Sequence, residues 1–281
     1  MIKFSLLMCV YEKENPLHLK ACLESINTQT VMPDEVVIVK DGPLTPELEE
    51  ILENYRLSQK QLSQNQKSPI NVNIIALPEN VTSGPARAAS VEAASYDWVA
   101  VMDSDDICKP DRFEKQLKMI EENPELGLIG GQIAEFVDDP EVTSATRTVP
   151  TNHDDIVRFA KFRSPFSQMT VMFKREAALD AGNYRYFLWF EDYDLWTRMI
   201  NNGTICANHP DVLVDARIGS GMYGRRRGVR YIKSEWRMQK QLRDLGIING
   251  FEFIRNIVLR IPVRILPGRC LELLYRGFTR E

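Results

Sequence analysis

Four short runs of apolar and β-branched residues alternate with helix-like segments along the first 110 residues. The apolar runs, each of which predicts a buried strand, span residues 4–10, 35–40, 72–77 and 98–102. The segments that predict helices span 16–28, 46–62 and an alanine-rich stretch that begins at residue 84. Because strands that alternate with helices form parallel sheets with right-handed crossovers, this part of the chain predicts an α/β fold with a mostly parallel sheet.

After Pro110 the alternation becomes less regular. The pattern predicts a helix, two strands and a second helix at 111–122, 126–136, 168–173 and 192–202. The last helix follows from an apolar stripe that consists of Leu188, Phe190, Leu195, Trp196 and Met199. The polar stretch 58–69 predicts a loose surface extension of one crossover. The pattern therefore predicts one large domain over 1–216, followed by a helical segment over 217–281.

The composition is that of an ordinary globular protein, with 281 residues of which 44% are apolar and 26% charged. The five cysteines are odd in number and widely scattered, which argues against a disulfide framework or a zinc site and favours a reducing cytosol. The N-terminus predicts a strand and not a signal peptide, because no small-residue cleavage site follows its apolar stretch. No stretch approaches the roughly 20 apolar residues of a membrane span.

The net charge of −4 conceals a strong asymmetry along the chain. Residues 217–281 contain thirteen Arg and two Lys against five acidic residues, a net charge near +10, so residues 1–216 are near −14. A basic tail on an acidic body suggests a nucleic acid or an anionic membrane surface as the partner of the tail. The acidic body disfavours nucleic acid, so we expect no nucleic-acid partner and favour the membrane.

Carboxylates stand at the ends of two predicted strands. Asp41 ends the second strand, while Asp103, Asp105 and Asp106 follow the fourth. Ligands of open parallel sheets bind beyond the carboxyl ends of the strands, so Asp41, Asp103 and Asp105 are expected to face one crevice. Like charges at such close spacing repel each other unless a cation, hydrogen bonds or water offset them. The cluster therefore predicts a bound positive charge, although a solvated acidic turn is the plainer alternative.

Four stretches of the sequence together resemble the glycosyltransferase family 2 enzymes. They are Tyr11-Glu12 after the opening strand, "VVIVKDGPLTPEL", "NVTSGPARAAS", and "MDSDD" with the pair Glu191-Asp192 some ninety residues later. The resemblance is strongest to the branch that builds bacterial capsule, exopolysaccharide and O-antigen sugars. It implies the GT-A nucleotide-diphospho-sugar transferase fold, with a nucleotide-binding half over 1–110 and an acceptor half over 111–216. It also implies inverting transfer of a sugar from a nucleotide sugar, with UDP favoured, to a hydroxyl of a lipid-linked glycan.

The resemblance implies a metal site and a nucleotide site among the strand-end residues. Asp105 is the expected ligand of Mg²⁺ or Mn²⁺, with Asp103 on the metal or the ribose, because a divalent cation neutralises a diphosphate leaving group. Asp106 is either part of this cluster or a cap of the following helix. Asp41 is expected to bind the uracil ring, although Lys40 replaces a second Asp that many relatives have, and a simple strand-ending turn is the alternative. Tyr11 and Arg87 complete the expected nucleotide site.

The pair Glu191-Asp192 corresponds to the family's catalytic carboxylates. Asp192 is the expected base that removes the proton of the acceptor hydroxyl, and Glu191 is expected to orient the acceptor or raise the pKa of its neighbour. The structural alternative is that both residues cap the helix 192–202. His209 is left out of the metal site, because a lone His beside Pro is more often structural. Arg225, Arg226 and Arg227 either contact phosphates or form a solvated charge run.

The basic tail contains a second amphipathic pattern. Ile254, Ile257, Val258 and Ile261 share one helical face, while Arg255, Arg260, Arg264 and Arg269 recur between apolar residues. Such a helix lies in a membrane interface or packs on its own domain, and the pattern alone leaves both open. Together with the implied lipid-linked acceptor, this amphipathic pattern predicts a cytoplasmic enzyme at the inner face of the plasma membrane.

Two other classes of protein share part of this pattern. "VAVMDSDDI" is similar to the nucleophile strand of haloacid-dehalogenase phosphatases, but three strands precede it here, and Asp41 and the Glu191-Asp192 pair would have no role. A catalytically inactive scaffold that binds a membrane or partners through its tail is the second alternative.

Overall fold

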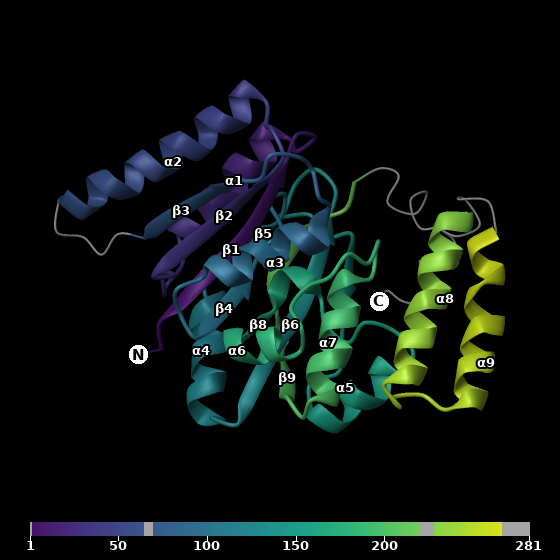
Figure 1. Ribbon diagram of the computed structural model, residues 1–281. Coiled ribbons are helices and arrows are strands. Elements are labelled where there is room, and N and C mark those ends of the chain that lie inside the picture. The colour runs from purple at the N-terminus through teal and green to yellow at the C-terminus, as the bar shows by residue number, and fades with distance from the viewer. Residues whose placement is uncertain (1, 65–69, 220–227, 266–281) are drawn as a thin grey trace.

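The computed structural model describes residues 2–64, 70–219 and 228–265. A nine-stranded sheet forms its centre, with helices on both faces (Figure 1). The strands are β1 (Phe4–Tyr11), β2 (Glu35–Asp41), β3 (Asn71–Ala76), β4 (Trp98–Val101), β5 (Ile107–Cys108), β6 (Leu126–Phe136), β7 (Ala145–Arg147), β8 (Met172–Lys174) and β9 (Ile205–Arg217). The α-helices are α1 (Pro16–Asn27), α2 (Pro46–Gln64), α3 (Ser83–Ala93), α4 (Arg112–Glu122), α5 (His153–Ala160), α6 (Arg175–Asp180), α7 (Glu191–Asn201), α8 (Val229–Asp244) and α9 (Gly250–Arg260).

The sheet runs in the order β3-β2-β1-β4-β8-β6-β9-β5, and β7 pairs with β6. Strands β1 to β4 are parallel to one another, as the sequence pattern predicts. Strand β8 is antiparallel to both β4 and β6, which joins the parallel part to a second part in which β6 and β9 are parallel. The carboxyl ends of β1, β2 and β4 therefore open on the same edge of the sheet.

Several predicted elements differ from the observed ones. Residues 168–170 of the predicted strand 168–173 form a 3-10 helix, and β8 is shorter and starts later. Helix α2 continues through much of the stretch expected to be a loose extension, of which residues 65–69 lie outside the described residues. The basic tail forms two helices and a final 3-10 turn, Pro262–Ile265, within the residues described.

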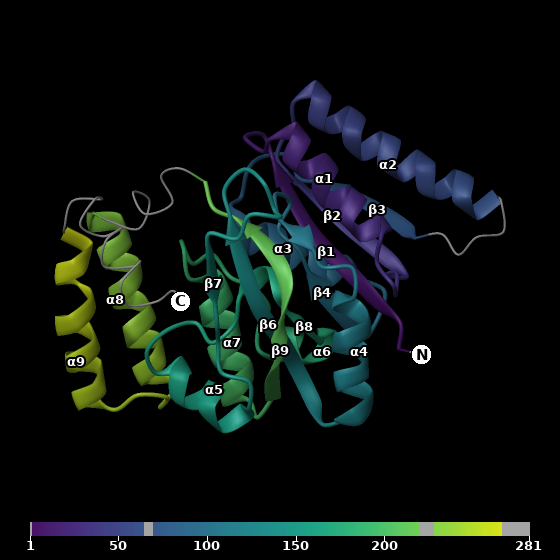
Figure 2. The same cartoon turned by 180° about the vertical axis from the view of Figure 1, so that it is seen from behind.

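Alternating side chains of the strands supply two separate cores. On β1, Leu6 and Met8 face α1, α2 and α4, while Leu7 faces α3 and the helices of the second half. A third cluster joins the α7 region to the two helices of the tail, and it consists of Phe187, Phe190, Tyr193, Tyr231, Met238, Leu242, Ile248 and Phe253. Figures 1 and 2 both place α8 and α9 side by side at the end of the molecule opposite α2. No helix of the described ranges is both long and apolar enough to cross a membrane.

The start of α3 is packed tightly against the loop that precedes α7. A Cβ atom at Gly84 would collide with the backbone carbonyl oxygen of Arg185 and would crowd Glu191. Backbone cannot move aside as a flexible side chain can, so this contact requires glycine. Gly84 thereby lets α3 and the start of α7 approach each other closely.

We predict that Gly84→Ala lowers the free energy of unfolding by about 1–3 kcal/mol, as overpacking does, although alanine is the better helix former by about 1 kcal/mol. The control is Gly250→Ala at the start of α9, where an added Cβ meets no atom within 4 Å. Urea unfolding followed by circular dichroism measures both variants. Equal stability of Gly84→Ala and the wild type would contradict the close approach.

Candidate active site

A cleft of about 770 Å³ lies at the carboxyl ends of the first parallel strands. Six of the seven residues singled out from the sequence line it: Tyr11, Asp41, Arg87, Asp103, Asp105 and Glu191. They come from the ends of β1 and β2, from α3, from the turn after β4, and from the first residue of α7. Asp192, the seventh, follows Glu191 in α7 and is half-buried, but it does not line the cleft itself.

Asp41 is held at the end of β2 by hydrogen bonds from the next loop. Asn80 Nδ2 donates to one carboxylate oxygen at 2.9 Å, and the backbone N–H of Val81 donates to the other at 2.7 Å. Burial raises the pKa of Asp41 above its ordinary value, although the backbone N–H groups of Val81 and Thr82 act in the opposite direction. The strand does end in a turn, since Gly42 adopts φ +85°, yet the Asp41 side chain also faces the cleft. Lys40 instead pairs with Glu49 at 2.8 Å.

Asp103, Asp105 and Asp106 occupy three different environments on one turn. Burial, followed by the negative charges of Asp103 and Glu14, raises the pKa of Asp105 to about 7. Asp106 is 2% exposed and accepts a hydrogen bond of 2.7 Å from the backbone N–H of Arg217, which ties this turn to the end of β9. Of the two alternatives for Asp106, a cap of the following helix does not apply, because α4 has Asp111 at its N-cap position. Its partner is an amide that is distant in sequence.

The guanidinium group of Arg87 joins the two halves of the cleft. Its Nη2 lies 2.8 Å from Asp103 Oδ1, and its Nη1 lies 2.8 Å from Glu191 Oε1. Burial opposes the positive charge, but the carboxylates of Asp103 and Glu191 more than offset this and hold the pKa of Arg87 above its usual value. Arg87 therefore links the turn after β4 to the start of α7.

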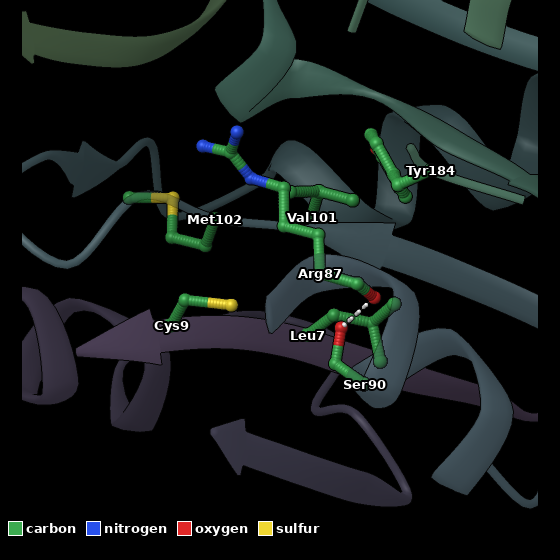
Figure 3. A pocket seen from close by; sticks show the side chains of 7 residues that line it. All are labelled: Leu7, Cys9, Arg87, Ser90, Val101, Met102 and Tyr184. Carbon is green, nitrogen blue, oxygen red and sulfur yellow. Dashed lines mark hydrogen bonds between the residues drawn. The ribbon is translucent and has the colours of Figure 1, made fainter. Parts of the chain in front are cut away.

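Arg87 also borders a small cavity, which shares Cys9 with the cleft (Figure 3). Leu7, Cys9, Val101, Met102 and Tyr184 line this cavity together with Arg87 and Ser90. Ser90 Oγ donates to the backbone carbonyl of Arg87 at 2.7 Å. Burial raises the pKa of the Cys9 thiol to about 12, so this thiol remains protonated at neutral pH.

Glu191 and Asp192 begin α7, where free N–H groups and the helix dipole favour negative charge. Glu191 does not cap the helix, because its carboxylate accepts hydrogen bonds from Ser83 Oγ and Arg87. Asp192 accepts from the backbone N–H of Tyr193 at 2.7 Å, so it satisfies one amide of the first turn. Burial, and then the charge of Glu191, raise the pKa of Asp192 to about 6. A carboxylate with this pKa suits a general base near neutral pH.

The backbone is strained at two residues that line the cleft. Thr82, just before α3, has φ +75°, and Trp189, two residues before Glu191, has φ +67°. Such conformations are costly for β-branched and bulky residues, and they concentrate at functional sites. The ring of Trp189 packs 5.0 Å from that of Tyr231 in α8. Neither position was found from the sequence, although both adjoin motifs that were.

Other residues of the cleft were also missed by the sequence analysis. They include Glu14, His18, Asn80, Ser83, Ser104, Leu188 and Trp189. Asn80 and Ser83 belong to the quoted stretch "NVTSGPARAAS", which was the available signal. Glu14 accepts a hydrogen bond from Ser104, a contact between segments ninety residues apart that no local pattern reveals. His209 is not among the cleft residues, as expected, while Arg225, Arg226 and Arg227 lie outside the described residues.

The carboxylates of the cleft fit a divalent cation whose remaining ligands are phosphate oxygens and water. Among residues 2–64, 70–219 and 228–265, no group of three or more His, Cys, Asp or Glu side chains is arranged to hold a metal ion. Mg²⁺, however, is commonly bound by only one or two carboxylates together with substrate phosphates and water. Asp105, whose ionisation is opposed by burial and by two neighbouring acids, is a carboxylate that a cation would stabilise.

Comparisons with known proteins agree with this geometry. The family model described as glycosyl transferase family 2 matches residues 5–185. The amylovoran biosynthesis glycosyltransferase AmsE of Erwinia amylovora is 36% identical over 275 residues, which are 97% of each chain. An Escherichia coli UDP-Gal:alpha-D-GlcNAc-diphosphoundecaprenol beta-1,3-galactosyltransferase is 33% identical over 279 residues, 99% of this chain and 97% of that protein.

Solved structures share the fold at low sequence identity. Staphylococcus aureus TarS 1-349 in complex with UDP-GlcNAc has a TM-score of 0.64 at 17% identity, over 99% of this chain and 74% of that one. The mannosyltransferase PcManGT of Pyrobaculum calidifontis, in complex with GDP-Man and Mn²⁺, has a TM-score of 0.63 at 14% identity, over 98% and 75%.

The mixed sheet, with its parallel first half and a carboxylate-lined cleft at its edge, has the GT-A fold of these transferases. The chain belongs to glycosyl transferase family 2. The resemblance inferred from the four sequence stretches is thereby confirmed, and none of these matches supports a haloacid-dehalogenase phosphatase.

We predict that Asp105→Asn raises the melting temperature of the metal-free protein at pH 8 by about 2–4 °C. A raised pKa means that the charged carboxylate costs folding free energy. This cost begins above the ordinary value of 3.8, grows as the pH rises and is complete above about pH 7, so only part of it is present at pH 5. The difference between variant and wild type should therefore shrink at pH 5. Calorimetry in EDTA measures it, with the exposed Asp154→Asn as the control. A fall in melting temperature at pH 8 would contradict the electrostatic argument.

Proposed function

We propose that this protein is an inverting glycosyltransferase that moves a sugar from a UDP-sugar to a hydroxyl group of a lipid-linked glycan. The reaction belongs to the synthesis of a bacterial surface polysaccharide. One observation carries the proposal: residues from two strand ends, one turn and two helices line a single cleft, and Arg87 connects its nucleotide side to Glu191. The division into a nucleotide-binding half over 1–110 and an acceptor half over 111–216 is part of the proposal.

The donor side of the cleft consists of Tyr11, Asp41, Asp103 and Arg87. Asp41 has lone pairs left to accept a ring N–H of uracil, since each carboxylate oxygen accepts more than one hydrogen bond. Tyr11 is 40% exposed at the end of β1 and offers its ring as a surface for the base. The printed names of the E. coli relative and of the TarS complex, UDP-Gal and UDP-GlcNAc, support a UDP donor.

Mg²⁺ or Mn²⁺ is the proposed cofactor, with Asp105 and Asp103 as its protein ligands. When bound, such a cation neutralises negative charge on the leaving diphosphate. The two carboxylates would hold the cation at the edge of the sheet. Arg87 fixes the orientation of Asp103 through its 2.8 Å contact. The Mn²⁺ complex of a mannosyltransferase with the same fold supports this choice.

Asp192 is the proposed base on the acceptor side. It takes the proton of the acceptor hydroxyl while the oxygen of that hydroxyl attacks the anomeric carbon from the face opposite the nucleotide. The new C–O bond forms as the bond between the anomeric carbon and the diphosphate breaks, and the nucleoside diphosphate leaves. Glu191, held by Arg87 and Ser83, keeps the start of α7 in place and raises the pKa of its neighbour.

The acceptor class follows from the relatives and from the charge distribution. One relative acts in amylovoran biosynthesis, and the name of another contains a diphosphoundecaprenol acceptor. An acceptor of that kind is anchored in a membrane, and the basic tail supplies the charge that an anionic membrane attracts. We therefore propose a cytoplasmic enzyme that works at the inner face of the plasma membrane.

We predict that Asp192→Asn keeps the affinity for UDP but lowers the turnover number by about 100- to 10,000-fold, which is the usual contribution of a general base. UDP release from a UDP-sugar with lipid-linked acceptor and Mn²⁺ measures turnover, and isothermal calorimetry measures UDP binding. Asp154→Asn on α5 is the matched control and should leave both unchanged. Normal turnover in Asp192→Asn would exclude it as the base. No UDP release from the wild type with a panel of UDP-sugars would favour an inactive scaffold.

The pH dependence of the reaction provides a separate test. Asp192 must be ionised to accept a proton, so kcat/KM should be constant above about pH 7 and fall about tenfold per unit below the pKa of about 6. If kcat/KM fell only near pH 4, where an ordinary aspartate titrates, the raised pKa of Asp192 would be contradicted. Initial rates at low donor concentration and saturating Mn²⁺ measure the profile.

A further inference from the structure

Helix α9 exposes a set of large apolar side chains to solvent. These are Phe251, Ile254, Val258 and Leu259, with exposed fractions of 75%, 62%, 63% and 63%. The first three follow one another at intervals of three and four residues, so they form one stripe, with Leu259 beside it. Phe253 and Asn256, on the opposite side of the helix, are buried. The four exposed residues are called the outer face of α9.

Contacts on the buried side fix the rotation of α9 about its axis. Asn256 Nδ2 donates to the backbone carbonyl of Lys161 and to Gln239 Oε1, both at 2.9 Å. Glu252 pairs with Lys161 at 3.1 Å, and Arg260 pairs with Glu235, which is fully buried in α8. Turning the outer face inward would break all of these contacts. The sequence pattern placed Ile257 and Ile261 on the same face as Ile254, but both are only partly exposed.

Positive charge accompanies the outer face. Residues 228–265 contain eight basic and three acidic residues, whereas residues 1–216 are near −14. On α8, adjacent to α9 in both Figures 1 and 2, exposed basic side chains recur at helical spacing at Arg230, Lys233, Arg237 and Lys240. Arg255, between Ile254 and Val258, stacks on Phe162 at 4.6 Å. Apolar stripe and cations thus occur on the same pair of helices.

We infer that the outer face of α9 inserts into the headgroup region of an anionic membrane, with the cations of α8 and Arg255 on the lipid phosphates. An amphipathic helix of this kind lies in the plane of the interface, with its apolar side chains among the upper acyl chains. The acidic body is repelled by the same membrane, so only this end of the molecule can approach it. Trp236, 48% exposed and packed edge-on against Phe253, suits the interface, where aromatic rings with a polar group accumulate.

This inference rests on the proposed function only for its purpose, which is to bring the cleft to a lipid-linked acceptor. The docking surface itself depends on exposure, charge and packing of α8 and α9. A second copy of the chain or another protein could also cover an apolar stripe, but neither accounts for the separation of charge between the body and this hairpin. An anionic lipid surface accounts for both the apolar and the charged features.

Flotation of the full-length protein with vesicles tests the inference. The vesicles contain phosphatidylethanolamine with about 30% phosphatidylglycerol, and pure phosphatidylcholine vesicles serve as the uncharged comparison. We expect the double variant Ile254→Glu/Val258→Glu to lower the partition coefficient by at least about tenfold. Two charged side chains would then replace two apolar ones that insert into the membrane. Leu17→Glu, at a position 73% exposed on α1 of the acidic body, is the matched control and should float like the wild type.

A second variant tests the charge component. Lys233→Glu/Lys240→Glu leaves the outer face intact and should reduce binding to the anionic vesicles at low salt, with little difference from the wild type at about 0.5 M NaCl. All altered side chains are exposed, so the melting temperatures should stay near that of the wild type. This variant keeps the inference testable if the first one is unstable.

Three results would overturn the inference. The first is that the wild type does not float with the anionic vesicles. The second is that Ile254→Glu/Val258→Glu floats as the wild type does. The third is that the wild type is a dimer in sedimentation and this variant is a monomer, with no change in flotation, which would identify a second copy as the occupant of the outer face. UDP release in detergent solution is measured on the same variants and should equal that of the wild type. Because flotation requires no turnover, failure of the docking inference and failure of the proposed reaction are separate results.

Discussion

The cleft depends on one partly buried arginine side chain that is shared by two carboxylates. Arg87 lies between Asp103, at the end of β4, and Glu191, at the start of α7, with 2.8 Å to each. If the guanidinium were lost, two acids would remain facing each other across the cleft. Because these side chains are partly solvated, the cost should be smaller than the roughly 3–5 kcal/mol of a fully buried pair that loses one member. The same contact fixes the distance between the nucleotide side and the proposed base. Structure and chemistry thus rest on the same ion pairs.

The four strands and three helices of the first half were predictable from the spacing of their apolar residues. Each strand is an unbroken apolar run, and the helices between them fit a helical pattern. The second half was less predictable. Strand β9 contains Pro210, and its pairing with β6 shifts register several times, so it shows neither clean alternation nor an unbroken apolar run. Strands β5 and β7 have two and three residues, which is too short for any period to be visible. Helix α5 is a single short amphipathic element between loops.

The candidate site was predictable to the extent that its residues stand at strand ends or in recognisable motifs. Asp41, Asp103 and Asp105 meet because parallel strands end on one edge, which the topology dictates. The role of Asp106 was not predictable, because its partner is the amide of Arg217, more than a hundred residues away. The strained backbone of Thr82 and Trp189 leaves no trace in composition or periodicity. Long-range contacts of this kind become visible only in the folded chain.

The stacking of Trp189 on Tyr231 has a consequence for how this enzyme can be divided. Tyr231 belongs to α8, and with Met238 and Leu242 it packs on Phe187, Phe190 and Tyr193, which adjoin Glu191 and Asp192. A shortened protein that stopped at residue 216 would expose these aromatic rings to water and remove the neighbour that holds Trp189 in its unfavourable conformation. The helical hairpin thus packs against Trp189, which itself lines the cleft, and attempts to isolate a minimal catalytic core should retain it.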